Sequence, residues 1–167
     1  VGVVAVITPW NWPLTLLIRS LVPALAAGNA TVVKPASITP AITVEALALL
    51  AAQPGLPAGI LSCVLGSGGI VGEALVGHDG VDMIAFTGET ETGIRVMKRA
   101  AEGLRKVALE LGGKAPNLVF ADANLDKAVH DVLWGAFITA GQRCSGTATA
   151  LVERSLFAEF AQKLEQK

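Results

Sequence analysis

Val107-Ala108-Leu109-Glu110-Leu111-Gly112-Gly113 is the stretch at which the pattern of this sequence changes. Upstream of it, apolar runs alternate with amphipathic segments almost continuously. Strands are predicted over residues 3–8, 30–34, 60–65, 82–86 and 107–111, and helices over residues 14–27, 41–52, 70–76 and 91–102. Strands that alternate with helices favour right-handed crossovers and a parallel sheet. The first part of the chain is therefore predicted to be α/β, a Rossmann-like parallel sheet with helices on both faces.

Downstream of the two glycines the elements follow one another differently. A strand is predicted over residues 117–120, and the link to the strand before it is too short for a helical crossover. An apolar stripe predicts a helix over residues 125–140, with Asn124 as its N-cap and Gly141 as its end. A strand over residues 147–152 and a helix over residues 157–164 complete the pattern. We place a domain boundary at the glycines, between residues 1–112 and a second α/β domain that begins with residues 113–167.

The composition narrows the class of protein. Of the 167 residues, 52% are hydrophobic, and the mean hydropathy is +0.57. The most apolar window, residues 14–28, is interrupted by Arg19 and Pro23 and is too short to cross a bilayer. Continuous apolar runs are instead typical of strands buried on both faces of a parallel sheet. The 13 basic and 14 acidic residues nearly cancel and form no basic stripe, so nucleic acid and anionic membranes are poor candidate partners.

The two cysteines lie in different contexts. Cys63 belongs to the apolar run of residues 60–65, where we expect it to be buried and structural. Cys144 lies in a polar loop between Gly141 and Gly146. Two cysteines do not make a disulfide framework, so we expect a reduced, cytoplasmic protein. No signal peptide or metal-binding cluster is recognisable, and both ends of the chain look cut, so we expect a fragment of a longer protein.

Cys144 and Glu110 suggest covalent catalysis. A nucleophilic cysteine must be ionised and reachable, and the glycines that flank Cys144 favour an exposed loop. The alternative is a small apolar side chain that fills space. Glu110 ends an otherwise apolar strand, where a buried carboxylate is suited to general-base chemistry. For Glu110 the alternative is a salt bridge to Arg105, Lys106 or Lys114.

Asn11 lies in a run with two prolines and two tryptophans, residues 8–13. A rigid loop of this kind can hold an amide N–H toward a developing oxyanion, which contributes about 3 kcal/mol to catalysis in known cases. Asparagine beside proline is also a common turn former. The local sequence alone favours the turn.

Three further features are suited to a nucleotide. Lys34 follows a buried strand, from which it can reach hydroxyls or phosphates. The run Gly66-Ser67-Gly68-Gly69 follows another strand, and Gly88 and Gly93 bracket the start of a helix. Glycines at strand-to-helix turns allow backbone amides to approach phosphate oxygens. No Gly-Lys-Ser/Thr follows, so this is not a P-loop, and each feature alone also suits an ordinary turn.

Taken together and in this order, these motifs resemble those of the aldehyde dehydrogenases over essentially all 167 residues. They are, in chain order, Asn11, Lys34, the Gly88–Gly93 turn, Glu110 and Cys144. The resemblance implies that residues 1–112 are part of an NAD(P)-binding domain and residues 113–167 the N-terminal part of a catalytic domain, together about the middle third of the enzyme.

The resemblance also implies a mechanism and a cofactor, NAD or NADP. The Cys144 thiolate would attack an aldehyde to give a thiohemiacetal, whose oxyanion is held by Asn11 and the Cys144 backbone amide. Hydride transfer would leave a thioester, which water activated by Glu110 would hydrolyse to the acid. The resemblance carries over these cofactor contacts by position: Ile7, Thr8, Pro9 and Trp10 near the ribose and nicotinamide side, Lys34 on the adenosine ribose, Gly88 at the diphosphate with Gly93 in the same turn, and Leu111 near the nicotinamide.

Two positions depart from the family pattern. Ser37 stands where many NAD-using relatives carry a glutamate that holds the ribose hydroxyls. Without that carboxylate a 2′-phosphate meets less repulsion, so the choice between NAD and NADP stays open. Glu89 stands where relatives commonly place a serine near the diphosphate. Because a carboxylate would repel phosphate, we expect Glu89 to point into solvent.

Two other functions remain alternatives to aldehyde oxidation. In a CoA-acylating relative, the acyl group of the thioester would pass to CoA instead of water. In a non-catalytic binding protein, the same fold would bind a ligand without transforming it. The expected partner is a small-molecule aldehyde whose identity the sequence does not reveal. By resemblance the parent protein is expected to be a homodimer or homotetramer, and the fragment alone to be inactive.

Overall fold

The computed structural model describes residues 2–167, and the chain divides into two units. The first unit ends at Leu111, and the second comprises Gly112–Lys167. The sheet of the first unit has five parallel strands in the order β3-β2-β1-β4-β5. They are β1 (Val3–Ile7), β2 (Ala30–Lys34), β3 (Leu61–Cys63), β4 (Met83–Thr87) and β5 (Lys106–Glu110). Since β2 and β4 flank β1, the direction of winding reverses beside β1, which is where doubly wound sheets bind ligands.

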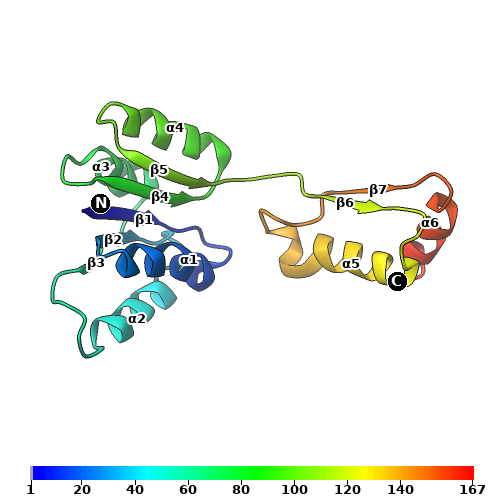
Figure 1. Ribbon diagram of the computed structural model, residues 1–167, viewed down its shortest axis with the longest axis horizontal. Coiled ribbons are helices and arrows are strands. Elements are labelled where there is room, and N and C mark those ends of the chain that lie inside the picture. The colour runs from blue at the N-terminus through cyan, green and yellow to red at the C-terminus, as the bar shows by residue number, and fades with distance from the viewer. Residues whose placement is uncertain (1) are drawn as a thin grey trace. The chain divides into compact units, whose positions relative to one another are not determined.

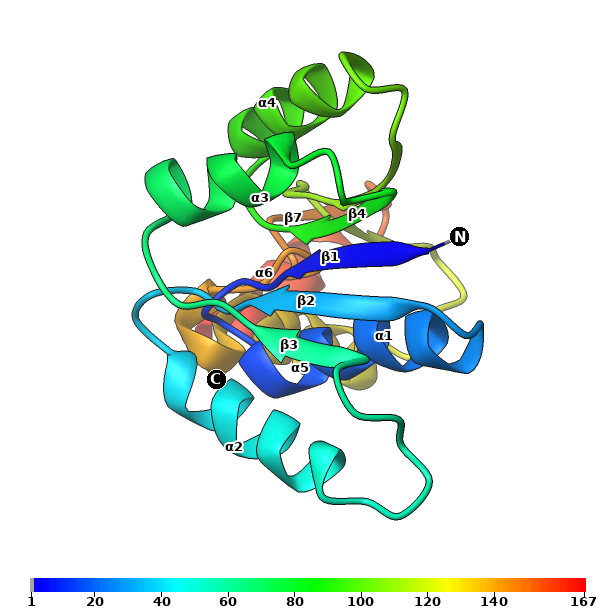
Figure 2. The same cartoon turned by 90° about the vertical axis from the view of Figure 1, so that its left-hand side faces the viewer.

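Helices cover both faces of this sheet, as predicted (Figures 1 and 2). α1 (Pro13–Ala26) and α2 (Pro40–Ala51) lie on one face, and each begins with a proline, which suits the first turn of a helix. The short turn η1 (Gly68–Gly72), α3 (Glu73–Gly77) and α4 (Thr90–Ala101) belong to the other face. No helix within residues 2–167 is long and apolar enough to cross a membrane.

The side chains of β1 point alternately to the two faces of the sheet, which explains why two hydrophobic cores form. Val4 and Val6 pack on one face with Leu17 and Leu21 of α1. Their neighbours Ala5 and Ile7 pack on the opposite face with side chains of α3 and α4. Successive side chains of a strand point to opposite faces, so a fully apolar strand needs a helical layer on each side.

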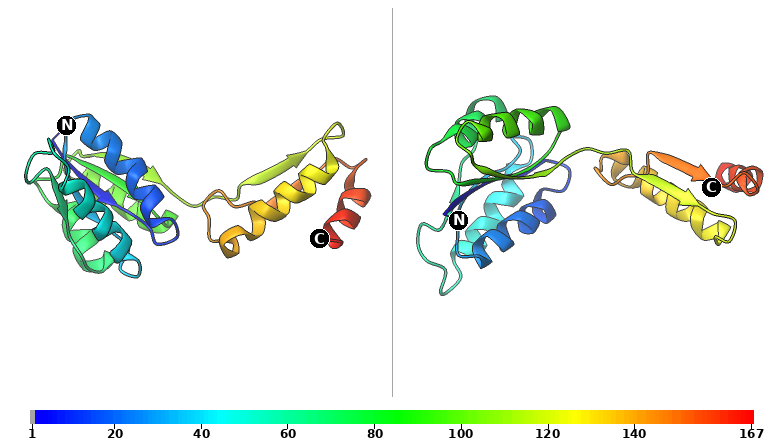
Figure 3. Two further views of the ribbon diagram at one scale, coloured as in Figure 1. Left: turned by 90° about the horizontal axis from the view of Figure 1, so that it is seen from below. Right: turned by 45° about the horizontal axis from the view of Figure 1, so that its top comes forward.

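The second unit has its own small sheet and core. β6 (Pro116–Val119) and β7 (Thr149–Val152) pair in parallel, and α5 (Leu125–Phe137) connects them. Asn124 caps α5, because its Oδ1 accepts the Lys127 N–H at 3.0 Å, as predicted. α5 lies along the two strands (Figure 3), and α6 (Phe157–Glu165) completes the core, whose buried residues are Val119, Val129, Val132 and Phe160.

Most element boundaries differ from the predictions by one to three residues, and two of these differences have a clear structural cause. β3 is shorter than the predicted strand of residues 60–65, because only β2 pairs with it at the edge of the sheet. The predicted helix of residues 125–140 ends at Phe137, and a tight turn, η2 (Ile138–Gly141), follows. Thr139 and Ala140 both have positive φ, 54° and 53°. A left-handed backbone is unfavourable for a β-branched residue such as Thr139. The apolar stripe of the sequence continues through these residues and therefore does not reveal that the helix has ended.

Candidate functional site

The carboxyl ends of the parallel strands gather most of the predicted cofactor residues at one edge of the sheet. Ile7 is in register with Lys34 on one side and with Phe86 on the other. Thr87 pairs with Glu110 in the same way. Thr8 and Gly88, which follow β1 and β4, therefore lie at this edge as well. Residues from four strands, far apart in sequence, meet where such sheets bind ligands.

A hollow of about 180 Å³ opens at this edge, on the face of α3 and α4. We call it the Lys34 hollow. Its lining comes from the ends of β1, β2 and β4, from η1 and α3, and from α4. The residues are Ile7, Lys34, Gly68, Gly69, Gly72, Glu73, Val76, Phe86, Thr92, Arg95 and Val96.

Lys34 is buried, with 3% of its surface exposed. Its Nζ donates a hydrogen bond to the Pro35 carbonyl at 2.7 Å. Burial lowers the pKa of the Lys34 ammonium, because a charge loses hydration there, and the nearby Cys63 partly offsets this. A Cβ added to Gly72 would lie 3.6 Å from Lys34 Cε. The ammonium is thus held beside a glycine-rich turn, an arrangement that suits ribose or phosphate oxygens.

Thr8 leaves a buried polar atom without a partner. The residue is buried at the end of β1, and its Oγ1 has no hydrogen-bond partner within the described part of the chain. Buried hydroxyls are normally satisfied, so a group that supplies a partner would stabilise this site. Together with the Lys34 hollow, this atom makes the edge of the sheet a fit for a polar cofactor.

Ser37 is exposed, and its Oγ donates to the Gly66 carbonyl at 2.9 Å. The bond joins the segment after β2 to the one after β3. A hydroxyl therefore stands at position 37, and this residue adds no negative charge to the edge of the sheet.

The glycines before and within α4 lie close against neighbouring side chains. A Cβ at Gly88 would lie 2.6 Å from Phe86 Cζ, and a Cβ at Gly93 would lie 2.4 Å from Leu111 Cδ2. Leu111 is partly buried against the core that contains α4. Glu89 is exposed at the N-cap of α4, and its Oε2 accepts a hydrogen bond from Thr92 Oγ1 at 3.4 Å. Its place relative to a diphosphate stays a prediction.

The segment between β1 and α1 carries the remaining predicted residues of the first unit. Pro9 and Asn11 are half-buried, and Trp10 is exposed. Asn11 Oδ1 accepts the backbone N–H of Trp12 at 3.1 Å, just before α1 begins. This bond is of the turn-forming kind. An oxyanion would require the other end of the same amide, Nδ2, as donor.

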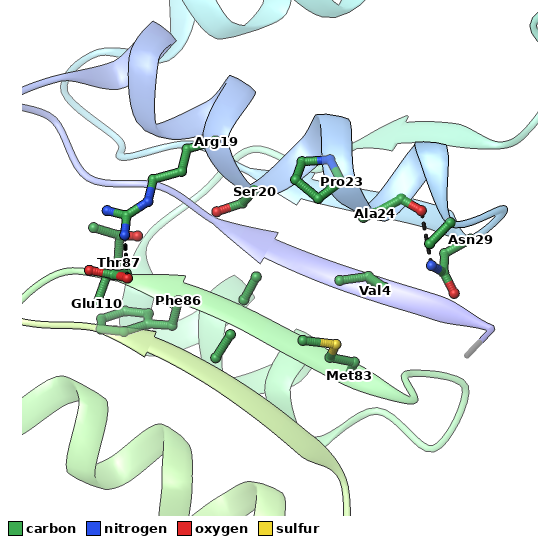
Figure 4. Close-up of a pocket in the computed structure, with 13 residues that line it drawn as sticks. Val4, Arg19, Ser20, Pro23, Ala24, Asn29, Met83, Phe86, Thr87 and Glu110 are labelled. Atoms are coloured by element: carbon green, nitrogen blue, oxygen red, sulfur yellow. Dashed lines mark hydrogen bonds and ion pairs between the residues drawn. The ribbon is translucent and has the colours of Figure 1, made fainter.

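Glu110 is not buried, contrary to our expectation. It is the last residue of β5, at the rim of a second hollow of about 360 Å³ on the α1 face (Figure 4), and 49% of its side chain is exposed. Its carboxylate forms an ion pair with Arg19 of α1, with Nη2 and Oε1 2.5 Å apart. A salt bridge was the alternative reading, but Arg19 replaces the predicted partners Arg105, Lys106 and Lys114. Lys106 and Ala108, on the same face of the edge strand β5, are exposed as well, so water reaches this face of the strand.

Cys144 is exposed in the loop between η2 and β7. Two contacts shape this loop: the Arg143 N–H donates to the Gly141 carbonyl at 2.8 Å, and the Arg143 guanidinium lies 5.3 Å from the centre of the Trp134 ring. A Cβ added to Gly113 would lie 3.4 Å from the Cys144 carbonyl oxygen. The reading of Cys144 as a buried space-filling residue is therefore wrong. Cys144 and Glu110 belong to different units, and their proximity stays a prediction.

Cys63 is exposed, so the expectation of a buried structural cysteine is wrong. It ends the edge strand β3, which has a neighbour on one side only. Partial burial nevertheless raises the pKa of the Cys63 thiol, and the ammonium of Lys34 opposes this shift.

Sequence reasoning missed two cationic residues. Arg19 pairs with Glu110, and Arg95 lines the Lys34 hollow. The signal for Arg19 was available, since it is a lone charge in an apolar helix. Arg95 gave no such signal, because charges are expected on the solvent side of an amphipathic helix.

Comparisons with known proteins agree on one family. The sequence matches the family model of the aldehyde dehydrogenase family over residues 1–167. The betaine aldehyde dehydrogenase of Bacillus subtilis (strain 168) is 44% identical over 167 residues, which are 100% of this chain and 34% of that protein. The succinate-semialdehyde dehydrogenase (NADP(+)) of Escherichia coli (strain K12) is 47% identical over 166 residues, 99% of this chain and 34% of that protein.

Solved structures give the same result. A crystal structure of betaine aldehyde dehydrogenase from Staphylococcus aureus in complex with NAD+ matches with a TM-score of 0.93 at 44% identity, over 98% of this chain and 32% of that one. An NADP dependent enzyme of E. coli matches with a TM-score of 0.92 at 47% identity, over 99% of this chain and 34% of that one. The chain spans about a third of the length of the curated relatives that it matches.

Proposed function

Since the chain belongs to the aldehyde dehydrogenase family, we propose that its protein oxidises an aldehyde to a carboxylic acid through a covalent intermediate on Cys144. The observation that carries this proposal is the exposed Cys144 in its glycine-flanked loop, within a chain that matches the family over its whole length. On this proposal, the unit that ends at Leu111 belongs to the cofactor-binding domain, and Gly112–Lys167 begins the catalytic domain.

NAD or NADP is the proposed cofactor. One solved relative is a complex with NAD+ and another is an NADP dependent enzyme, which supports this choice. The chain's own residues suit it as well, through the buried Lys34, the unpartnered Thr8 hydroxyl and the glycine-rich turn. When bound, the oxidised nicotinamide supplies the acceptor for a hydride. Ile7, Pro9, Trp10, Ser37, Gly88, Glu89, Gly93 and Leu111 are proposed to shape the rest of its site.

The proposed chemistry begins at the Cys144 sulfur. The thiolate adds to the aldehyde carbon, a C–S bond forms, and the carbonyl oxygen becomes an alkoxide. An N–H of the Asn11 side chain and the backbone N–H of Cys144 would stabilise this oxyanion. When the carbon gives up its hydride, the C=O bond re-forms and leaves a thioester on Cys144.

Glu110 is the proposed base for hydrolysis. It would accept a proton from water, whose oxygen then adds to the thioester carbon. The C–S bond breaks, the thiolate returns to Cys144, and the carboxylic acid leaves. Exposure of the Glu110 carboxylate supports this role, because water must reach it. To accept this proton, the carboxylate would either break its ion pair with Arg19 or bind the water with one oxygen while the other still contacts Arg19.

The test uses the full-length polypeptide, a simple aldehyde, and NAD or NADP in separate assays. We expect Cys144→Ala to abolish formation of reduced cofactor, and Glu110→Gln to allow a single burst followed by a stall. Cys63→Ala is the matched control and should retain turnover. An assay with added CoA separates hydrolysis from acyl transfer, since a CoA-acylating enzyme would turn over only when CoA is present.

Alkylation provides a second readout. Because burial raises the pKa of the Cys63 thiol, Cys63 should react with iodoacetamide slowly at neutral pH, and we expect Cys144 to be labelled first. Absence of turnover with every aldehyde tried, together with equal labelling of both thiols, would instead favour a protein that only binds.

A further inference from the structure

A second cation stands at the Lys34 hollow. Arg95, on α4, lines the same hollow as Lys34 on β2. Arg95 is exposed, whereas Lys34 is buried. One cation therefore forms the inner wall of the hollow and the other stands at its mouth.

The neighbours of Arg95 orient it without neutralising it. Its Nη2 donates to Thr92 Oγ1 at 3.1 Å, and Thr92 Oγ1 in turn donates to Glu89 Oε2 at 3.4 Å. Within residues 2–167 no carboxylate forms an ion pair with the Arg95 guanidinium. Glu73 also lines the hollow and opposes the positive charge there. The guanidinium has five N–H donors, and the four that do not contact Thr92 are suited to an anion of matching geometry.

We propose that Arg95 is a specificity-determining residue that binds the 2′-phosphate of NADP, so that the protein prefers NADP to NAD. This inference rests on the proposed function, in which Lys34 contacts the adenosine ribose. The 2′-phosphate is attached to that ribose and is the only chemical difference between the two cofactors.

The chemistry of the side chains favours a phosphate at this place. A guanidinium binds phosphate oxygens through two parallel N–H bonds and keeps its charge at any accessible pH. Ser37, after the same strand as Lys34, brings a hydroxyl in place of a carboxylate, so no negative charge from that position repels a phosphate. Arg95 and Ser37 thus act in the same direction, one by attraction and the other by the absence of repulsion.

A different role for Arg95 would have a different signature. A guanidinium that stacks on the adenine ring would strengthen the binding of NAD and NADP equally. The two roles are separated by comparing ligands that share the adenosine and differ only in the 2′-phosphate.

The experiment measures binding of 2′,5′-ADP and of 5′-AMP to the full-length protein by calorimetry, without any aldehyde. We expect Arg95→Leu to weaken 2′,5′-ADP at least about tenfold and to change 5′-AMP by less than about twofold, since a charge-assisted bond is lost for one ligand only. Arg95→Lys should recover part of the loss. Lys98→Leu is the matched control, because it removes one positive charge from α4 outside the hollow, and it should leave both affinities within about twofold.

Four results would overturn the inference. An equal loss for both ligands in Arg95→Leu would indicate stacking, and no loss for either would remove Arg95 from the site. Binding of 5′-AMP without tighter binding of 2′,5′-ADP would mean that NAD is preferred, while the proposed function stands. If the unmodified protein binds neither ligand, the proposed cofactor site fails, and this inference fails with it.

Discussion

Lys34 presents a buried ammonium that forms no ion pair within the described residues, and such a charge costs stability. A residue of this kind is retained where a function needs it. Replacing it with methionine, which has a similar length, removes the cost of burying the charge.

We therefore expect Lys34→Met to leave the free energy of unfolding unchanged or to raise it by about 1 kcal/mol, and to weaken binding of the cofactor strongly. Urea denaturation and cofactor titration measure the two effects. A clear loss of stability would mean that Lys34 is a structural residue whose hydrogen bond to Pro35 outweighs its burial.

The pH dependence of cofactor binding follows from the same residue. The pKa of Lys34 is lowered from its ordinary value by burial, so its proton is lost at a lower pH than that of an exposed lysine. Its positive charge is present below the lowered pKa and disappears as the pH rises through it. We expect affinity for the cofactor to fall over that pH range in the unmodified protein and not in Lys34→Met. An identical pH profile in both proteins would contradict this.

Arg19 and Glu110 form an ion pair whose side chains are 54% and 49% exposed. Exposed ion pairs contribute about 0–1 kcal/mol to stability. We expect Arg19→Leu, Glu110→Gln and the double variant to reveal a coupling energy below about 1 kcal/mol in a double-mutant cycle. Hydrolysis of the thioester should nevertheless be lost in Glu110→Gln. A coupling of about 3 kcal/mol or more would instead favour the structural reading of Glu110.

At the scale of elements, the start of α4 is fitted to the segment after β5. Gly93 has no φ constraint, but a Cβ there would lie 2.4 Å from Leu111 Cδ2. An alanine at this position would therefore force Leu111 to move, independently of the proposed contact between this turn and a diphosphate.

We expect Gly93→Ala to lower the free energy of unfolding by about 1 kcal/mol, because Leu111 must move to relieve the contact. Leu111→Ala in the same chain should recover part of the loss. Gly69→Ala is the matched control: nothing lies within 4 Å of its added Cβ, and it should be neutral or stabilising by about 0.5 kcal/mol. Equal effects of the two alanine substitutions in a thermal melt would contradict the packing argument.

At the scale of the whole chain, the two units differ in the size of their cores. The first has two clusters of buried apolar side chains, one on each face of a five-stranded sheet. The second has a single cluster, over a two-stranded sheet. Small sheets with little burial are marginally stable by themselves.

For this chain we therefore expect backbone amides of β6, β7 and α5 to exchange with deuterium faster than those of β1, β2 and β4. Hydrogen-exchange mass spectrometry with peptide resolution measures this. Uniform protection across both units would show that the chain unfolds as one cooperative body.

The sequence by itself determined the type and order of the elements, the parallel sheet with helices on both faces, and the family. These follow from local patterns: alternating apolar runs, a capping Asn124, and motifs in a defined order. Such patterns do not fix element boundaries that depend on neighbouring segments, as at the short edge strand β3 and at the left-handed residues Thr139 and Ala140.

Only the tertiary structure decided which side chains meet. The partner of Glu110 is Arg19, 91 residues away in the chain, because α1 packs on the face of the sheet to which the Glu110 side chain points. Arg95 shares a hollow with Lys34 because β2 ends at this edge of the sheet and α4 packs on the adjoining face, against β1 and β4. Exposure of Cys63 likewise depends on its place at the sheet's edge. Such contacts depend on the order of strands in space, which local sequence patterns do not encode.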